Sequence, residues 1–518
     1  MNNLTNEKWL PHLPTEVMLD ARDNKLCSYT IALEAWRRGL KITFHSRLVK
    51  KTKQHLPGFL FTISDDEKSF RFYKARGPRV TKKAVVQGGN KIISKELLDE
   101  KGIPVPKGQL FPKEKSVDEI IAFANEIGYP VVLKPLGGDQ GKGVIPNIHD
   151  DDYLNEAIQH VRGQLKYSNL ILEKHVTGEE YRIYVLEDEV LAVLNRIPAH
   201  VIGDGKNSIK QLIKIKNNER KKNPRLYNCL IDIDFEVKNV LKSLGYTPES
   251  IPSANEKVFL RTKSNISKGG DSVEMTDEFP QRLKDLAVRT LKSIPDFPHG
   301  GVDMMVDFSL PEEQQAHIIE LSPTPQIGSL LFPMEGQARD IPAALIDYYF
   351  PETKSKRNAN SHLYFNFKDV LKPIVNQTAE DVTVVSCPTH IEKQIKYIVS
   401  GRVQGIGYRK WVRKRAIQKH LNGYARNEKD GTVTIAIAGK IEDVDAFKRL
   451  CKRGPKKAKV NTIEEQEWNT PIKAGFEILG AKKKVAKSKK KVSTKKTPMK
   501  RKTIMQRIVG KIKRMIKA

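Results

Sequence analysis

Two short segments near the C-terminal end constrain this chain more than any other feature of its sequence. The first, Gly401 to Arg409, reads as a strand followed by a glycine-bearing loop that ends in an arginine. Without a Cβ to block the approach, backbone N–H groups in such a loop can converge on a small anion. The planar guanidinium of Arg409 suits a phosphate. The second, Gly423 to Gly439, holds a strand with Asn427, which can position a water for in-line attack. Since neither segment contains Ser, Cys or His, we expect direct attack by water.

These two segments resemble the acylphosphatase family over residues 391 to 480. The matching positions are Val403, Gln404, Tyr408 and Arg409, then Gly423, Asn427, Gly431, Val433 and Gly439. The resemblance implies a ferredoxin-like βαββαβ domain that hydrolyses a carboxylic–phosphoric anhydride without a metal or other cofactor. By this match Arg409 binds the phosphate and Asn427 positions the water. The alternative is a retained fold that only binds anions or a partner.

The length of 518 residues predicts three or four domains in a multidomain α/β and α+β chain. The four cysteines lie far apart and match no metal-binding spacing, and no run of 18 apolar residues exists, so we expect a cytoplasmic protein with reduced thiols. The predicted parts are an N-terminal α/β region (1–80), a large α/β block (81–352), a linker with an extra strand (353–390), the small domain (391–480) and a basic tail (481–518).

The large block contains a second candidate phosphate-binding loop. An apolar strand ends at Lys134 and opens into a loop that is rich in glycine between Gly137 and Gly143. Such a loop can close over a triphosphate through its backbone N–H groups while the lysine neutralises charge. Because many glycine-rich loops bind no nucleotide, the prediction of a nucleotide site depends on the carboxylates further along the chain.

These carboxylates lie at the ends of later predicted strands. Glu173 ends one strand and Glu180 begins the next, with Val176 in the connector between them. Two carboxylates that flank a hinge can accept hydrogen bonds from an adenine amino group and from ribose hydroxyls. Asp303 lies in a further strand and Glu320 ends the one after it, an arrangement that suits Mg²⁺ held together with nucleotide phosphates. Each carboxylate alone is equally consistent with a solvated strand end, so their order along the chain is the stronger signal.

Taken in this order, the block resembles the ATP-grasp superfamily, and most of all the ATP-grasp domains of cyanophycin synthetase and of bifunctional glutathione synthetases. The resemblance implies that Lys91 and Lys134 bind the nucleotide. It further implies that Glu173 contacts adenine, that Val176 is the hinge residue and that Glu180 binds ribose. The expected cofactors are therefore ATP and Mg²⁺.

The same resemblance assigns the metal and the reacting phosphate. Asp303 and Glu320 match metal-binding carboxylates, and Arg196 is the candidate for stabilising charge on the transferring phosphoryl group. Where the family usually has Asn two residues after the glutamate, this chain has Ser322. A serine hydroxyl is a shorter and weaker ligand, which leaves open a nucleotide-binding domain without ligase activity.

The net charge of +30 is concentrated in the tail, because residues 481 to 518 hold 17 Lys and Arg and no Asp or Glu. After a lysine-rich run that we expect to be disordered, Ile504, Ile508 and Ile512 fall on one face of a basic helix. Such a helix suits an anionic membrane surface or nucleic-acid phosphate. A solvated tail without a partner is the alternative.

Together the two resemblances predict one chain that makes and hydrolyses acyl phosphates. The large domain would join a small carboxylate, amino acid or peptide to an amine or thiol through an acyl phosphate, and the small domain would hydrolyse acyl phosphate. Two alternatives remain: an acylphosphatase with a regulatory, nucleotide-sensing domain, and a tethered protein that only binds nucleotide and phosphate. Related ligases are often dimers or tetramers, but nothing in the sequence encodes an interface, so a monomer and a homo-oligomer both stay open.

Overall fold

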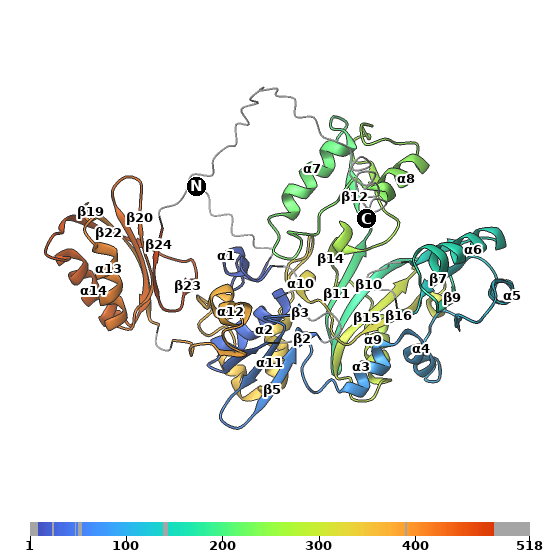
Figure 1. Ribbon diagram of the computed structural model, residues 1–518, viewed down its shortest axis with the longest axis horizontal. Coiled ribbons are helices and arrows are strands. Elements are labelled where there is room, and N and C mark those ends of the chain that lie inside the picture. The colour runs from blue at the N-terminus through green and yellow to red at the C-terminus, as the bar shows by residue number, and fades with distance from the viewer. Residues whose placement is uncertain are drawn as a thin grey trace, which may run out of the picture.

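The computed structural model describes residues 9–22, 25–46, 48–49, 54–137, 143–388 and 391–480 (Figure 1). The basic tail, and residues 138–142 of the glycine-rich loop that follows Lys134, lie outside the described residues, so the expectations placed on them stay predictions. Along the described part of the chain, no helix combines the length and apolar character needed to cross a bilayer.

The N-terminal region forms a mixed layer of helices on a small antiparallel sheet. The sheet has the order β18-β1-β4-β5, with strands β1 (Lys41–His45), β4 (Leu60–Ser64), β5 (Ser69–Tyr73) and β18 (Asp381–Thr383). The edge strand β18 comes from the segment expected to be a linker. It pairs with β1, where Thr43 lies opposite Thr383. The short elements β2 (Leu48–Val49), β3 (Gln54–His55) and α1 (Thr15–Met18) accompany this layer.

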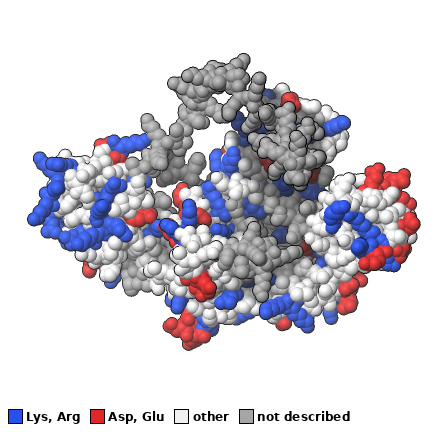
Figure 2. All heavy atoms as spheres, viewed as in Figure 1, with Lys and Arg blue, Asp and Glu red and all other residues white. Residues whose placement is uncertain are grey.

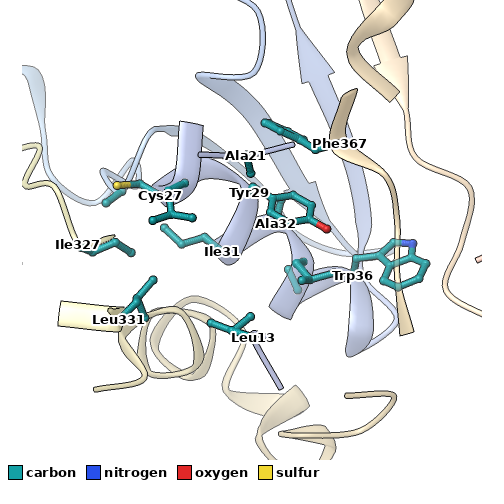
Figure 3. Close-up of a cluster of buried hydrophobic side chains, with 14 of the residues drawn as sticks. Leu13, Ala21, Cys27, Tyr29, Ile31, Ala32, Trp36, Ile327, Leu331 and Phe367 are labelled. Atoms are coloured by element: carbon teal, nitrogen blue, oxygen red, sulfur yellow. The ribbon is translucent and has the colours of Figure 1, made fainter. Parts of the chain in front are cut away.

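Helix α2 (Leu26–Arg37) is the centre of this region, and all of its residues are buried. Figure 3 shows its side chains between Ile327 and Leu331 on one side and Phe367 on another. The surrounding elements are α10 (Gly328–Leu331), α11 (Ile341–Tyr349), η5 (Pro351–Lys356), β17 (Leu363–Tyr364) and α12 (Phe367–Val375). Residues 353–390, expected to be a linker with one extra strand, therefore contain α12 and two short strands, β17 and β18, that pack onto the N-terminal layer.

The large block consists of two sheets with their helices. The first sheet has the antiparallel order β6-β9-β7-β8, formed by β6 (Gly108–Phe111), β7 (Val131–Pro135), β8 (Ile145–Ile148) and β9 (Leu170–Lys174). Its apolar face packs on helices α5 (Val117–Ile127) and α6 (Asp151–Ile158), which continues as η2 (Gln159–Gln164). Helices α3 (Lys82–Gly89) and α4 (Lys91–Asp99) precede it.

The second sheet is antiparallel and has the order β14-β11-β10-β15-β16. Its strands are β10 (Glu179–Leu186), β11 (Glu189–Ile197), β14 (Asp271–Glu274), β15 (His299–Val306) and β16 (Ala316–Ser322), with η4 (Glu312–Gln314) in the last hairpin. Successive side chains of a strand point to opposite faces. Tyr181, Ile183 and Val302 thus pack on α9 (Gln281–Lys292). The other face carries polar residues together with Tyr184, Ala192 and Leu194, which belong to the apolar core of the N-terminal region.

A smaller insertion comes after β11. It comprises β12 (His200–Ile202), α7 (Ile209–Arg220), α8 (Phe235–Ser243), β13 (Lys257–Phe259) and η3 (Ile266–Lys268) around its own apolar cluster. Arg220 is fully buried and joins the insertion to the second sheet, because its guanidinium donates to Asp271 at 2.8 Å and to the carbonyl oxygens of Cys229 and Gly270.

The C-terminal domain is a separate body at one end of the molecule (Figure 1). Its elements are β19 (Lys393–Arg402), α13 (Tyr408–Gln418), β20 (Asn422–Asn427), β21 (Val433–Gly439), α14 (Ile441–Arg453), β22 (Lys459–Glu467), β23 (Ile472–Lys473) and β24 (Phe476–Leu479). The sheet order β22-β19-β21-β20 is the one a ferredoxin-like βαββαβ fold requires, and β24 adds a fifth strand parallel to β20. This confirms the fold expected for the domain.

The C-terminal domain is docked on the N-terminal layer through a short parallel pairing. Leu363 of β17 lies opposite Ile472 of β23, and both are buried in the core of the N-terminal layer. Lys473 adds an ion pair of 2.7 Å to Asp369 of α12. The connection is therefore more than the covalent chain.

Candidate active sites

A polar stripe crosses one face of the second sheet of the large block. In the strand register Glu180 lies opposite Arg196, Arg182 lies opposite Asp303, and Asp303 lies opposite Glu320. Residues directly opposite each other in antiparallel strands point to the same face. The register therefore brings four residues predicted from the sequence, Glu180, Arg196, Asp303 and Glu320, to one face together with Arg182.

The carboxylate of Asp303 is held by two arginines. Arg182 donates from Nε and Nη2 to its two oxygens, both at 2.6 Å, and Arg196 Nη2 lies 2.9 Å from one of them. Burial disfavours the charged form of this carboxyl, but the two guanidinium groups outweigh it and hold the pKa of Asp303 at about 2. Asp303 is thus an anion under all ordinary conditions.

Glu180 has a different environment from Asp303. It accepts hydrogen bonds from Arg196 and from the hydroxyl of Ser264, a residue of the insertion. Burial raises the pKa of Glu180, and the negative charge of Asp303 adds to the rise against the opposing effect of Arg196. Arg196 consequently bridges the residue expected to bind ribose and the one expected to bind metal.

Glu173 lies in the first sheet and is 2% exposed. Its two oxygens are 2.5 Å from Lys134 Nζ and 2.5 Å from Lys95 Nζ. Burial lowers the pKa of Lys95 to about 8, and the neighbouring ammonium of Lys134 contributes. Lys95 was not among the residues predicted from the sequence, although its spacing of four from Lys91 on one helix indicated a shared face.

Most of these groups surround one cavity of about 520 Å³. Its wall includes the predicted residues Lys91, Lys134, Glu180, Arg196, Asp303 and Glu320. An adjoining hollow of about 560 Å³ is lined by Lys91, Gly137, Glu320 and Ser322. Val176 is half-buried in the connector between the sheets, and it lines neither cavity among the described residues. Glu173 does not line them either; it contacts Lys134, which lines the first of them.

Asp303 and Glu320 are the residues that could hold a metal. No group of three or more His, Cys, Asp or Glu side chains with metal-binding proximity occurs within the described ranges. The two carboxylates face the cavity from adjacent strands, and Ser322 lies two residues later on the same strand. Oxygen ligands of this kind, completed by nucleotide phosphates, fit Mg²⁺.

The second site lies in the C-terminal domain, at the loop between β19 and α13. Gly405 and Gly407 have φ values of 75° and 80°, a left-handed conformation that favours glycine. The amide N–H groups of residues 405–407 donate to no acceptor among the described residues. They lie directly before the N-terminus of α13, where the helix dipole favours an anion.

Arg409 lies in the first turn of α13, and its Nη1 donates to the carbonyl oxygen of Leu479 at 2.9 Å. Leu479 ends β24 and lies opposite Arg426 in the parallel pairing with β20. Asn427 is the next residue, so the sheet brings Arg409 and Asn427 to one edge of the domain. The Oδ1 atom of Asn427 is buried and has no hydrogen-bond partner in the described structure. An unsatisfied buried acceptor is costly, and a bound water would satisfy it.

Gln404 connects the loop to the turn after Asn427. Its Nε2 donates to the carbonyl oxygens of Glu428 and Thr432, both at 2.8 Å. Gln404 belongs to the family signature seen in the sequence, where it had no predicted role. The structure shows that it fixes the glycine loop against the β20–β21 turn.

Basic side chains cover much of the surface of the C-terminal domain. Figure 2 shows Lys and Arg gathered over this end of the molecule. Exposed members on α13, on the last turns of α14 and just beyond are Lys410, Arg413, Lys414, Lys452, Arg453, Lys456 and Lys457. The surroundings of the glycine loop are therefore electropositive, which favours anionic substrates.

Comparison with known proteins identifies both domains. Residues 395–478 match the acylphosphatase family, and residues 88–205 match the RimK-like ATP-grasp domain. The chain is 32% identical over 311 residues to the glutathione biosynthesis bifunctional protein GshAB of Desulfotalea psychrophila, covering 56% of this chain and 39% of that protein. It is 32% identical over 272 residues to the cyanophycin synthetase of Trichormus variabilis, covering 52% and 30%.

The chain thus spans less than half the length of these curated relatives. Among solved structures, the acylphosphatase of Bacillus subtilis is 33% identical, with 17% of this chain and 97% of that chain covered and a TM-score of 0.16. Both predicted resemblances are confirmed, as is the mixed α/β multidomain fold class. The chain therefore combines a RimK-like ATP-grasp domain with a C-terminal domain of the acylphosphatase family.

Proposed function

We propose that this chain is a bifunctional enzyme that forms an acyl phosphate from ATP and a carboxylate, transfers the acyl group to an amine or thiol, and hydrolyses acyl phosphate in its C-terminal domain. The observation that carries the proposal is the polar stripe of Glu180, Arg182, Arg196, Asp303 and Glu320 facing one cavity with Lys134. Its location in a chain that matches the RimK-like ATP-grasp domain supports a phosphoryl-transfer site.

In this proposal Lys91 and Lys134 hold the nucleotide phosphates. Glu173 and Val176 border the adenine, and Glu180 binds the ribose. Asp303 and Glu320, with Ser322, would hold Mg²⁺, which when bound neutralises phosphate charge. Arg196 already contacts both Glu180 and Asp303, and a guanidinium between the nucleotide and metal positions is suited to charge on the transferred phosphoryl group.

In the C-terminal domain the proposed reaction needs no metal. The N–H groups of residues 405–407 and the guanidinium of Arg409 bind the phosphoryl oxygens, and the field of α13 favours their charge. Asn427 Oδ1 accepts a hydrogen bond from the attacking water. The unsatisfied, buried state of that oxygen is the observation that supports a water at this position.

The two activities act on the same functional group, so we propose that the C-terminal domain removes acyl phosphate that escapes the ligase site. The four described thiols are all unpaired and buried, which supports the expected cytoplasmic setting. The relatives' names suggest amino acids or peptides as substrates, and the tail remains a proposed contact to anionic lipid or nucleic acid.

The test is ADP formation by the full chain with Mg-ATP and hydroxylamine, which converts acyl phosphate to a stable hydroxamate, over a panel of amino acids and short peptides. In an Asn427→Ala background we expect more hydroxamate than in the intact chain, and none after Lys134→Ala. Failure of every carboxylate to give ADP or hydroxamate, while benzoyl phosphate is still hydrolysed, would contradict the ligase half alone.

Two observations favour a second candidate, a regulatory ATP-grasp domain that only senses nucleotide. Both oxygens of Asp303 are engaged by arginine, and Ser322 replaces the amide expected as a further metal ligand. ATP binding without turnover, together with an ATP-dependent change in benzoyl phosphate hydrolysis, would select this candidate.

A further inference from the structure

We propose that the cavity of the ATP-grasp domain contains a separate anion subsite, centred on Arg225, that binds a second carboxylate of the substrate. This inference rests on the proposed function and deepens it, because it makes the substrate a di- or polycarboxylic acid. The subsite is formed by Arg225 of the insertion and Lys74 of the N-terminal layer, with Lys263 beside them on the cavity wall.

Arg225 is a buried cation without a carboxylate partner among the described residues. It lines the cavity, its exposed fraction is 9%, and its Nε has no hydrogen-bond partner within the described structure. Its Nη1 donates to the thiol sulfur of Cys229 at 2.9 Å. A buried charge is costly unless an opposite charge compensates it, so the compensating anion is most simply a group of the ligand.

The backbone around Arg225 is fixed. The side-chain oxygen of Asn223 accepts from Arg225 N at 2.8 Å, and the amide of Asn223 donates to the carbonyl oxygen of Phe332 at 2.8 Å. The stem of Arg225 also packs closely on Gly328, where a Cβ would lie 2.9 Å from its Cδ. The guanidinium is therefore held in place in the absence of ligand, as a preorganised subsite requires.

Lys74 lines the same cavity as Arg225 and comes from the N-terminal layer. Its backbone has a φ of 54°, unusual for a residue with a side chain, and its N–H donates to Phe59 O at 2.8 Å. Its ammonium lies 5.0 Å from the centre of the Phe59 ring. Strained positions of this kind persist where the surrounding structure holds them and are concentrated at binding sites.

The charges of the cavity wall leave room for this anion. The basic residues are Lys74, Lys91, Lys134, Arg182, Arg196, Arg225 and Lys263, against the acidic residues Glu180, Asp303 and Glu320. Lys134, Arg182 and Arg196 are engaged with carboxylates of the protein. Mg²⁺ would compensate much of the charge of ATP, so the subsite at Arg225 selects for charge on the carboxylate substrate.

The test measures thermal unfolding of the full chain with dicarboxylates of three to six carbons and with monocarboxylates of equal length, each with and without Mg-ATP. We expect the dicarboxylates alone to raise the unfolding temperature. Arg225→Ala should weaken the dicarboxylate affinity about tenfold to a hundredfold, the effect of one charge-assisted contact. Lys221→Ala, an exposed neighbour, should bind as the unchanged chain does, and Mg-ATP should stabilise both variants.

Equal protection by both acid series, no protection by dicarboxylates, or protection that persists in Arg225→Ala would overturn the subsite. Stronger protection by inorganic phosphate than by every dicarboxylate would also overturn it. If Arg225→Ala does not fold, Arg225→Gln keeps the size of the side chain and removes the charge. Selective dicarboxylate binding without hydroxamate formation would leave the subsite standing and refute the ligase function.

Discussion

Arg182 and Asp303 lie opposite each other on neighbouring strands and form a bidentate ion pair, with Nε and Nη2 of Arg182 each 2.6 Å from a carboxylate oxygen of Asp303. Both side chains line the cavity on the polar face of the second sheet, and Asp303 is buried. The pair places a permanent cation against the carboxylate that would hold Mg²⁺. Its presence links the stability of the ATP-grasp domain to the charge of its candidate metal ligand.

The pH dependence of stability should report this pair. The pKa of Asp303 is about 2 in the folded chain, against roughly 3.9 in an unfolded chain. A carboxyl whose pKa is lowered by folding makes its full contribution to the free energy of unfolding at pH values above its pKa in the unfolded chain. It loses that contribution as the pH falls toward its pKa in the folded chain. The stability difference between the intact chain and Asp303→Asn should be constant from pH 5 to 7 and shrink between pH 4 and 2. Urea unfolding checks this, with exposed Asp285→Asn as the control; a difference that persists at pH 2 would contradict it.

Removing one side chain of the Arg182–Asp303 pair should lower the free energy of unfolding more than removing both. Arg182→Ala leaves Asp303 with Arg196 alone, and breaking a buried pair costs about 3–5 kcal/mol. The double change Arg182→Ala with Asp303→Ala should recover part of that loss, because no unpaired charge remains. Unfolding of the two single variants and the double variant gives the coupling energy. Additive single effects would show that the pair contributes little beyond its separate side chains.

Asn427→Ala should lower kcat for benzoyl phosphate about a hundredfold, the order expected when a group that orients a reactant is lost. KM should change little, because in the proposed mechanism Arg409 and the loop N–H groups, not Asn427, bind the phosphate. Asn461→Ala, an exposed amide on β22, serves as the matched control. The activity should also be unaffected by EDTA. Full activity of Asn427→Ala would remove this residue from the reaction.

Gln404→Ala should raise KM for benzoyl phosphate several-fold and lower the stability of the C-terminal domain. The two hydrogen bonds from Nε2 to Glu428 and Thr432 are the ones that hold the loop to the β20–β21 turn, and each contributes about 1 kcal/mol. Gln404→Glu keeps the size and removes the donor, so it should behave similarly. Unchanged kinetics in both variants would show that the loop holds its shape without this bridge.

Ile472→Ala should loosen the docking of the C-terminal domain. Ile472 is 2% exposed in the core of the N-terminal layer, and truncation of such a residue costs about 2–5 kcal/mol. Hydrogen exchange at Ile472 and Ala474 should accelerate, because their N–H groups donate to the carbonyl oxygens of His362 and Tyr364 across the short parallel ladder between the two bodies. Hydrolysis of benzoyl phosphate should stay within about twofold, since the glycine loop is formed by other elements. Unchanged exchange would contradict a role in docking.

The local features of both sites could be predicted from the sequence. The glycines between 401 and 407 predict a loop before the helix that carries Arg409. Apolar runs of the length of a strand predict the strands that end near Lys134, Glu173 and Glu320. The ferredoxin-like fold, which the resemblance to the acylphosphatase family implied, is confirmed, and Asp303 and Glu320 lie on consecutive strands as expected. The positions of such loops and strands depend on glycine content and side-chain alternation, which are properties of residues that are neighbours in the chain.

The tertiary structure decided which charged groups meet. Three polar contacts join residues that are 121, 78 and 84 positions apart in the chain: Arg182 with Asp303, Lys95 with Glu173, and Ser264 with Glu180. Likewise β18 closes a sheet begun by β1, and Arg225 reaches the cavity from an insertion. Register and packing between distant segments fix such contacts, and no local pattern encodes them. The sequence by itself therefore determined which chemical groups this protein has and on which elements they lie, while only the fold determined their partners, because charges act over distances in space and not along the chain.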